Sequence, residues 1–404
     1  MLLGAHRVIV TTDLDILNEV YIKQFHTFQA RMIHPSVAID QENGPQMNVF
    51  LGQGNRWKRL RALFAASLTV AKVKSVDPIM KRAHEELIEN LRKYENGVIN
   101  VKPLILNMTF AVISRSAMGI NEEFGKSDFL QKVMNAFDRG ETNVITEREN
   151  ESLEEKAKRH QDFLDFLREA QEDDLDTTNK ADFDTKIPKK LTRDELIGSS
   201  QAFLVAGGET TAILITHCLY ELALHPELEQ IILEEINEHI KTPDDIDYNC
   251  VKNLEYLERV VKETTRLHPS AYLVTARRAI ESVILQCSDG SSIQIDKGTC
   301  ILPNIPVITT DKKVWGKDAS EFNPDRFLPE NSENRHPMAW LPFGAGLRIC
   351  PGKTLAIYET KATLVRLLME YKFEFCNETQ TKEITKATLG FVELKMKIIP
   401  RKIV

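Results

Sequence analysis

The sequence lacks the closely spaced cysteine pairs on which small metal-bound or disulfide-rich domains depend. Its 404 residues contain six cysteines, at positions 218, 250, 287, 300, 350 and 376, and no two of them are separated by only two residues. Structural zinc sites normally use such pairs, so this spacing argues against a zinc cluster. The wide scatter is typical of a reducing compartment rather than of a disulfide framework.

Long apolar runs, a secretory leader and an excess of basic charge are also missing. A membrane-spanning helix needs roughly 18 to 20 apolar residues, whereas the longest apolar tract, around residues 211–224, contains His217 and Glu221. Residues 1–11 predict a strand rather than the apolar core of a signal peptide. The net charge of −7 argues against general binding to nucleic acid.

The composition is that of an ordinary globular protein, with 42% hydrophobic and 27% charged residues. By length alone the chain would form roughly two or three domains, unless one helical fold encloses a cofactor. Apolar periodicity predicts a mainly α protein with a smaller β portion. We expect helices at residues 13–25, 55–64, 77–94, 192–224, 226–241, 251–268 and 353–371. We also expect a buried apolar segment at 101–120 and, between 141 and 190, one amphipathic helix with Phe163, Leu164, Phe166 and Leu167 on its apolar side. Strands are expected at 7–11, 272–276, 283–287 and 292–295, a closing hairpin at 385–399, and a solvated linker at 173–190.

The longest predicted helix begins at a capping box over residues 192–195 and runs to Leu224, where a His-Pro pair ends it. At ~1.5 Å per residue it is about 50 Å long, enough to cross the molecule. Gly207 and Gly208 lie in its middle, and each costs about 1 kcal/mol relative to alanine. They indicate either room for a flat group against the backbone or close packing on a neighbouring helix.

One cysteine lies in a loop of distinctive composition. Residues 343–352 have the sequence FGAGLRICPG and precede the last predicted helix. The glycines allow a left-handed backbone and a close approach to a bulky group. The partly positive start of that helix, together with Arg348, favours a thiolate at Cys350. Such a thiolate is a nucleophile or a metal ligand, and a buried free cysteine is the simpler alternative.

This loop resembles the haem-binding loop of the cytochrome P450 monooxygenases, Phe-x-x-Gly-x-Arg-x-Cys-x-Gly, and every fixed position matches. The resemblance implies haem b with Cys350 as the axial iron ligand, and Phe343, Arg348 and Gly352 as cofactor-binding residues.

Residues 206–210, Ala-Gly-Gly-Glu-Thr, resemble the oxygen-activation motif of the same family. The resemblance implies that Ala206 borders the haem, that Thr210 holds dioxygen by hydrogen bonds, and that Glu209 feeds protons for cleavage of the O–O bond. The thiolate of Cys350 would donate electron density from the opposite side of the iron.

Three further charged residues resemble a structural network of the family. Glu263 and Arg266 lie at i and i+3 on one helix face, and Arg326 lies in a Pro-x-Arg-Phe segment. The resemblance implies a buried network of these three that holds the chain before the cysteine loop.

Haem carries two propionates, which need cations and hydrogen-bond donors. Trp57 and Arg61 match the family's Trp-x-x-x-Arg helix, and the resemblance implies that both meet propionate, as does Arg348. Arg277 occupies the position of another propionate partner in the family, and Arg278 is the alternative residue for that role. The basic residues around position 57 are alternatively a solvated basic face, whose exposed members could help an acidic redox partner to dock.

The matches span residues 57–352 and imply one catalytic domain over 1–404 with the cytochrome P450 fold, in which haem lies between the long central helix and the helix after the cysteine loop. The implied activity is insertion of one oxygen atom from O2 into an apolar small molecule, a lipid, steroid or xenobiotic. Electrons would come from an NADPH–cytochrome reductase or a similar donor. The resemblance is to microsomal eukaryotic members, which implies the cytosolic face of the endoplasmic reticulum membrane, with peripheral contact and no transmembrane segment in this chain.

Two features depart from the family pattern. The N-terminal anchor and the first helix are expected to be missing, and the interval 118–163, which normally roofs the substrate pocket, is short by several helical turns. We expect the pocket lining to include Phe203, Ala206, residues 271–274 and residues 389–391. Two alternatives stay open: an oxygen-independent isomerase of a fatty peroxide, whose relatives often lose the acid–alcohol pair, and a non-catalytic haem-binding remnant.

Overall fold

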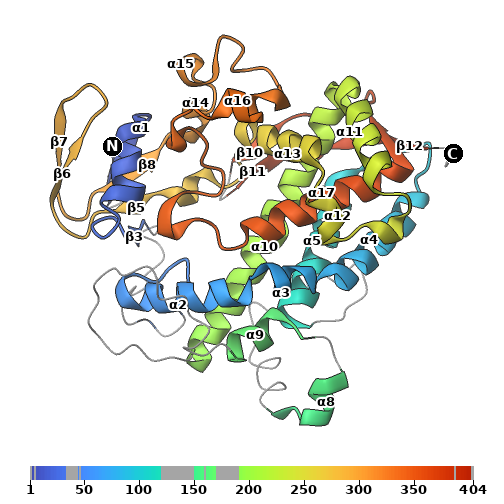
Figure 1. Ribbon diagram of the computed structural model, residues 1–404, viewed down its shortest axis with the longest axis horizontal. Helices are drawn as coiled ribbons and strands as arrows, with labels where there is room; N and C mark the ends of the chain where they lie inside the picture. Colours follow the sequence, from blue (N-terminus) through green and yellow to red (C-terminus); the bar gives the residue numbers. More distant parts are fainter. Residues whose placement is uncertain are drawn as a thin grey trace.

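Helix α10 (Arg193–Leu224) runs diagonally through the molecule and is the element around which the other helices gather (Figure 1). The computed structural model describes residues 2–3, 6–32, 44, 47–119, 150–158, 161–169, 191–385 and 388–401. Within these ranges helices dominate and strands form a smaller portion, which confirms the predicted fold class. The predicted linker at 173–190 and most of the short interval 118–163 lie outside the described residues.

Helix α10 starts at the predicted capping box. The Thr192 hydroxyl accepts a hydrogen bond from the Glu195 backbone at 3.2 Å, and the Glu195 carboxylate accepts one from the Thr192 backbone at 3.0 Å. The helix is long and apolar enough to cross a membrane, but 67% of its most apolar stretch is buried inside the protein. Here it serves as the core helix of a globular fold.

The two mid-helix glycines let α10 pack closely on α5 (Val101–Met118). A methyl group at Gly207 would come within 2.6 Å of Ile113, and one at Gly208 within 2.8 Å of Phe110. Of the two interpretations offered for these glycines, the structure therefore supports close packing on a neighbouring helix.

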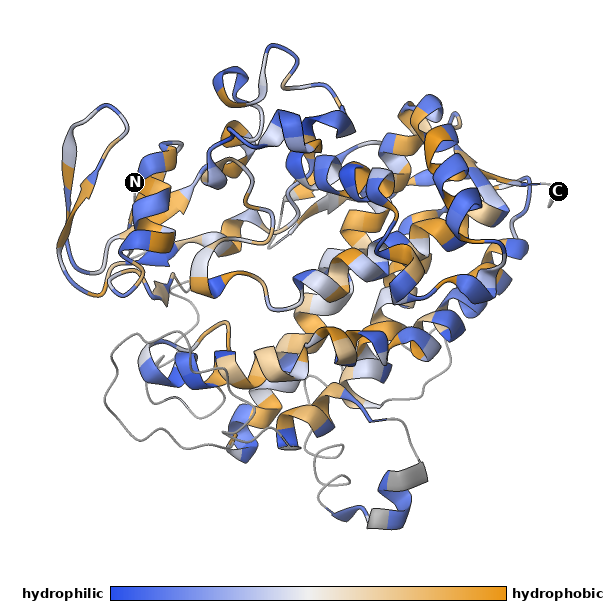
Figure 2. Ribbon diagram, in the orientation of Figure 1, coloured by the Kyte–Doolittle hydropathy of each residue, from blue (hydrophilic) through white to orange (hydrophobic). Residues whose placement is uncertain are grey.

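Most of the longer helices complete a large apolar core around α10, and their inward faces carry the hydrophobic residues (Figure 2). Helices α1 (Leu14–Asn18) and α14 (Ile305–Ile308) pack in a separate, smaller apolar cluster. The longer helices are α2 (Gly54–Ser67), α4 (Asp77–Arg92), α9 (Phe163–Glu169), α11 (Pro226–His239), α13 (Glu255–Leu267) and α17 (Lys353–Glu370). The shorter ones are α1 (Leu14–Asn18), α3 (Val70–Lys74), α8 (Leu153–Lys158), α12 (Tyr248–Val251), α14 (Ile305–Ile308), α15 (Lys312–Trp315) and α16 (Pro329–Ser332).

The strands form a five-stranded sheet near the N-terminus, a three-stranded sheet and two hairpins. The five-stranded sheet has the order β1-β2-β8-β5-β3, with bounds Leu2–Leu3, His6–Thr11, Cys300–Pro303, Arg277–Arg278 and Ala30–Arg31. The three-stranded sheet has the order β4-β12-β9, with bounds Val98–Asn100, Lys395–Pro400 and Tyr371–Glu374. The hairpins pair β6 (Val283–Gln286) with β7 (Ser292–Ile295), and β10 (Glu383–Thr385) with β11 (Leu389–Phe391).

Three predicted elements differ from the structure. The expected strand at 272–276 is a 3₁₀ turn (Tyr272–Thr275), because side chains take its carbonyls: Thr275 binds that of Tyr272 at 2.7 Å and Arg31 binds that of Val274 at 2.6 Å. The expected closing hairpin is divided between two sheets, since β11 pairs with β10 whereas β12 pairs with β4 and β9. The expected helix at 13–25 is α1 followed by a π-helical turn (Glu19–Lys23).

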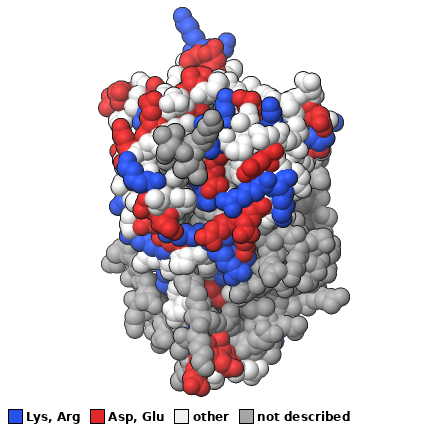
Figure 3. Space-filling view, turned by 90° about the vertical axis from the view of Figure 1, so that its right-hand side faces the viewer, with Lys and Arg blue, Asp and Glu red and all other residues white. Residues whose placement is uncertain are grey.

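The surface at the end of the molecule that holds α11 carries both signs of charge. Figure 3 shows lysine and arginine side chains interspersed with aspartate and glutamate over the described part of this face. Such mixing is typical of a solvated surface.

Candidate active site

The cysteine loop is shaped by two glycines in left-handed backbone. Gly344 has φ 71° and Gly346 has φ 65°, a region that other residues adopt only with strain. Gly346 also lies directly against the backbone of the π-helical turn, where a methyl group would overlap the carbonyl oxygen of Tyr21. The loop closes through a 2.8 Å hydrogen bond from the Cys350 N–H to the Phe343 carbonyl. The prediction of left-handed glycines is confirmed at these two positions.

Burial raises the pKa of the Cys350 thiol above its usual value. Four groups oppose that effect: the backbone N–H of Gly352, which caps α17, and the positive charges of Arg61, Arg31 and Lys353. The protein thus surrounds the half-buried Cys350 thiol with positive potential, and an approaching metal ion would displace its proton.

Arg348 is held by the chain that precedes α2. Its guanidinium donates to the carbonyls of Gly52 at 2.5 Å and Phe50 at 3.3 Å, and lies over the indole ring of Trp57 at 4.6 Å. It therefore ties the cysteine loop to the chain at the start of α2.

Four arginines gather beside the cysteine: Arg31, Arg61, Arg277 and Arg348. Burial and the neighbouring guanidinium groups lower the pKa of Arg31 to about 9 and hold that of Arg348 well below its usual value. Across the described part of the chain, no carboxylate forms an ion pair with any of the four. Buried like charges without counterions are unfavourable, so this cluster indicates an anionic ligand.

Several hydrogen-bond donors of this cluster are left without acceptors. The Nε atoms of Arg31, Arg277 and Arg348 are buried and have no partner. Among the described residues, the Arg61 guanidinium and the Trp57 indole N–H also lack a hydrogen-bond acceptor. Buried donors are normally satisfied. A group with two carboxylates, such as haem with its propionates, would supply these acceptors, so the residues present fit the predicted cofactor.

Arg31 is a member of the cluster that the motifs did not predict. It belongs to β3, and the antiparallel register of β3 with β5 places it opposite Arg277. Because this pairing joins residues 246 positions apart, no local pattern signals it. Strand β5 also contains both candidate propionate partners, Arg277 and Arg278. Arg277 is 1% exposed and lies over the Tyr21 ring at 4.6 Å, whereas Arg278 binds the Gln53 side chain.

The basic helix α2 is not simply a solvated face. Arg59 is buried, and both Arg56 and Arg59 form ion pairs with Glu195 in the first turn of α10. These two residues fix α2 against α10, so that Trp57 and Arg61 are held beside the cysteine loop.

The middle of α10 has an exposed stretch. Ala206 and Glu209 are exposed and Val205 is 57% exposed, although most of the helix is buried. The Thr210 hydroxyl donates to the Ala206 carbonyl at 2.6 Å, which leaves its lone pairs free to accept a hydrogen bond. Within the described residues, no hydrogen bond or ion pair joins this stretch to the cysteine loop.

The expected pocket-lining residues fall into two groups. Leu273 and Val274 are 37% and 38% exposed, so a ligand can reach their side chains. Phe203 is instead buried in the core, stacked between Phe64 at 4.8 Å and Phe163 at 5.5 Å between ring centroids.

The predicted network of Glu263, Arg266 and Arg326 is confirmed. Arg266 binds both carboxylate oxygens of Glu263, at 2.6 and 2.7 Å, and Arg326 lies 3.4 Å from the same carboxylate. Glu263 and Arg266 are completely buried. Arg266 also donates to the carbonyls of Thr309 and Ala319, so the network fixes the chain that leads to the cysteine loop.

Comparison with known proteins agrees with this geometry. A family model described as cytochrome P450 matches residues 1–139 and 126–400. The Caenorhabditis elegans protein named cytochrome P450 cyp-13B1 is 30% identical over 93% of this chain and 81% of its own length. Cytochrome P450 CYP13A4 of the same organism is 30% identical over 98% of this chain and 86% of its own length. The chain therefore belongs to the cytochrome P450 family, the haem monooxygenases whose iron is held by a cysteine thiolate.

Proposed function

We propose that the protein inserts one atom of O2 into an apolar small molecule, a lipid, steroid or xenobiotic, at a haem b site built around Cys350. The observation that carries the proposal is the cluster of four arginines beside the thiol, which lacks a carboxylate partner among the described residues. Haem b has two carboxylates and an iron that accepts a thiolate, so one group satisfies both features. When bound, haem supplies the oxygen chemistry, while the protein supplies binding, orientation and proton transfer.

Each site residue has a role in this proposal. Cys350 holds the iron, and Phe343 and Gly352 shape the loop that presents it. Ala206 borders the cofactor from α10. The propionates are held by Trp57, Arg61, Arg277, Arg348 and, in addition to the residues predicted from motifs, Arg31.

Glu209 and Thr210 transfer protons. Glu209 is exposed, so water reaches its carboxylate. The Thr210 hydroxyl donates a hydrogen bond to the Ala206 carbonyl, and its free lone pairs can accept another hydrogen bond. Retention of this pair favours oxygen activation over the peroxide-isomerase alternative.

Electrons come, in this proposal, from an NADPH-dependent reductase on the cytosolic face of the endoplasmic reticulum membrane. The support is the resemblance to microsomal members of the family. The exposed apolar side chains Leu273 and Val274 suit an apolar substrate in the same way, because a lipid, steroid or xenobiotic buries apolar surface on binding.

The first experiment is the carbon monoxide difference spectrum of the reduced, haem-loaded protein. We expect the red-shifted Soret band of thiolate-ligated haem in the natural protein, and its loss in Cys350→Ala. Cys287→Ala is the matched control, since Cys287 is another free, half-buried cysteine, and it should keep the band. A Cys350→Ala protein with an unchanged thiolate spectrum would contradict the site.

Substrate class is tested next by titrating apolar ligands into the ferric protein and by counting product formed per NADPH consumed. Turnover of a fatty hydroperoxide without NADPH consumption would favour the isomerase instead. Bound haem that no apolar ligand perturbs would favour the non-catalytic remnant.

A further inference from the structure

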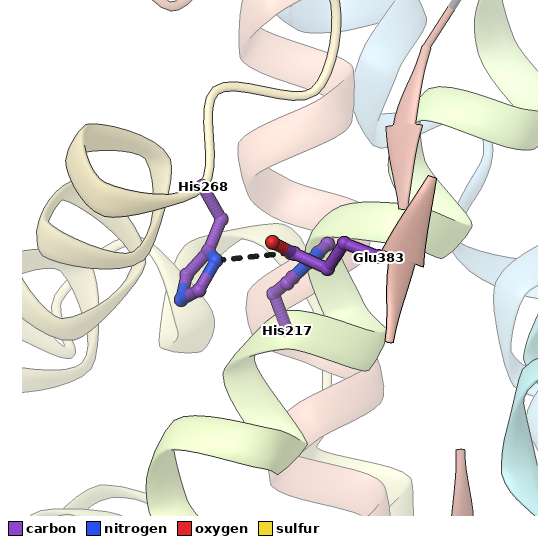
Figure 4. A group of neighbouring side chains, drawn as sticks. All are labelled: His217, His268 and Glu383. Atoms are coloured by element: carbon purple, nitrogen blue, oxygen red, sulfur yellow. Dashed lines mark hydrogen bonds and ion pairs between the residues drawn. The ribbon is translucent and has the colours of Figure 1, made fainter. Parts of the chain in front are cut away.

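A second cluster of ligating side chains lies away from the haem site. His217 of α10, His268 at the end of α13 and Glu383 of β10 converge from three elements (Figure 4). His217 Nε2 lies 2.6 Å, and His268 Nδ1 3.3 Å, from the same carboxylate oxygen of Glu383. The three ligating atoms all lie within 4.8 Å of one another.

The other nitrogen of each imidazole is held by an oxygen acceptor. His217 Nδ1 lies 2.8 Å from the Ile213 carbonyl, and His268 Nε2 lies 2.6 Å from the Glu221 carboxylate. Metal-ligating histidines almost always have this arrangement, because the outer partner fixes the ring and directs the free lone pair toward the metal. Here both remaining nitrogens are directed toward Glu383 (Figure 4).

The charges of the cluster are balanced only if two positive charges enter it. Glu221 and Glu383 have only histidines as ion-pair partners among the described residues. Protons on both rings would make each of the four contacts between a ring nitrogen and an oxygen a hydrogen bond. Burial opposes a charge on His217, however, and lowers the pKa of its imidazole. Two imidazolium cations would also stack with ring centroids 4.4 Å apart. One divalent cation can replace the two protons shared with Glu383 and keep the net charge unchanged.

We propose that His217, His268 and Glu383 bind a divalent cation of the zinc class. Imidazole and carboxylate are ligands that zinc accepts, with bonds of about 2.0–2.2 Å. Tetrahedral bonds of that length separate ligating atoms by roughly 3.3 Å. The His268–Glu383 contact already has that separation, at 3.3 Å, whereas the His217–Glu383 contact must widen from 2.6 Å.

Binding requires one ring to turn. The two imidazole planes lie 22° apart, close to parallel, so their lone pairs converge on one ion only after a rotation that breaks the stack. Phe391, whose ring lies 4.5 Å from that of His217, packs beside the moving group. The Glu383 side chain is 30% exposed, which gives the ion a path to solvent and a water for its fourth position.

The ion would tie the β10–β11 hairpin to the central helix. The hairpin already packs closely there, because a methyl group at Gly390 would lie 3.1 Å from Ile213 of α10. The Leu389 N–H also binds the Ser270 carbonyl, close to His268, at 2.7 Å. Since residues 389–391 are expected to line the pocket, the metal would fix one wall of the substrate site.

The test is equilibrium dialysis of the haem-loaded full chain against Zn²⁺, followed by metal analysis as zinc per iron. We expect one zinc per iron in the natural protein, and affinity at least about 100-fold lower in His217→Phe and in Glu383→Gln. Glu383→Gln keeps the shape of a partly exposed side chain, so it tests the site even if His217→Phe fails to fold. His239→Phe, on the exposed surface of α11, is the matched control and should bind zinc normally.

The coordination sphere decides whether the free cysteines bind the zinc instead. X-ray absorption at the zinc edge should show nitrogen and oxygen neighbours and no sulfur. Sulfur ligation, absence of stoichiometric zinc, or equal affinity in His217→Phe and Glu383→Gln would each overturn the proposal.

Discussion

The cysteine loop allows a direct comparison between two glycines that share a left-handed backbone and differ in how closely other atoms approach them. Both Gly344 and Gly346 have a left-handed backbone, with φ 71° and 65°. A methyl group at Gly344 has only the Arg348 carbonyl oxygen near it, at 4.0 Å, whereas one at Gly346 would overlap the Tyr21 carbonyl oxygen. Substitution by alanine therefore tests conformational strain alone at Gly344, and strain plus overlap at Gly346.

The two contributions can be given magnitudes. Alanine in the left-handed region costs about 1–2 kcal/mol, which is the whole expected loss of unfolding free energy for Gly344→Ala. Overpacking of a tight contact adds about 1–3 kcal/mol. Because the contact is with backbone rather than with a flexible side chain, the loop itself must shift at Gly346→Ala. We expect a total loss of about 2–5 kcal/mol and a displaced Cys350.

Urea unfolding of the haem-loaded variants measures the loss of unfolding free energy. The carbon monoxide difference spectrum measures the displacement of Cys350. Gly344→Ala should keep most of its thiolate band, whereas Gly346→Ala should lose much of it to haem without thiolate ligation. Equal destabilisation and equal spectra in the two variants would refute the claim that contact with Tyr21 positions the cysteine.

Three further substitutions test other parts of the site. Glu263→Gln should lower the unfolding free energy by about 3–5 kcal/mol in urea, because it leaves the buried Arg266 without its counterion. Thr210→Ala should keep haem bound but lower the amount of product formed per NADPH consumed. Thr216→Ala is the control, because the Thr216 hydroxyl also bonds its own helix at 2.6 Å, and it should leave that ratio unchanged; an equal ratio in both variants would contradict the proton-transfer role. Arg61→Gln should leave the haem-free protein as stable or up to about 1 kcal/mol more stable by thermal unfolding, since it removes repulsion, yet it should destabilise the haem-loaded protein. A loss of stability in both forms would show that Arg61 has a structural partner.

Local spacing carried the correct predictions. Glu263 and Arg266 lie three residues apart on one helix, and that spacing brings them together in any fold that keeps the helix. The capping box at Thr192 and the left-handed glycines of the cysteine loop are likewise properties of short segments, so the sequence predicted them before any tertiary contact was known.

Features that depend on long-range pairing were missed or misassigned. Arg31 enters the arginine cluster only through the register of β3 with β5. The contact of Arg348 with the Gly52 carbonyl joins residues far apart in the sequence, and no local pattern signals it. The choice between the two interpretations of Gly207 likewise needed its contact with Ile113 of α5. The 3₁₀ turn at Tyr272–Thr275 has strand-like composition, but side chains satisfy its carbonyls in place of a neighbouring strand.

The haem site and the histidine cluster both contain unbalanced charge, which is positive at the haem site and negative at the histidine cluster. Beside Cys350, buried guanidinium groups lack carboxylates among the described residues, so the site is incomplete until an anion enters. Around His217, two carboxylates have imidazoles as ion-pair partners and form no ion pair with an arginine or lysine of the described chain. That cluster is therefore incomplete until two protons or one divalent cation enter. Each imbalance is unfavourable in the ligand-free fold, and the ligand that relieves it gains affinity by the same amount. Stability measured with and without each ligand, rather than activity alone, therefore reports on both sites: haem should raise the melting temperature through the arginines, and zinc through His217, independently of each other.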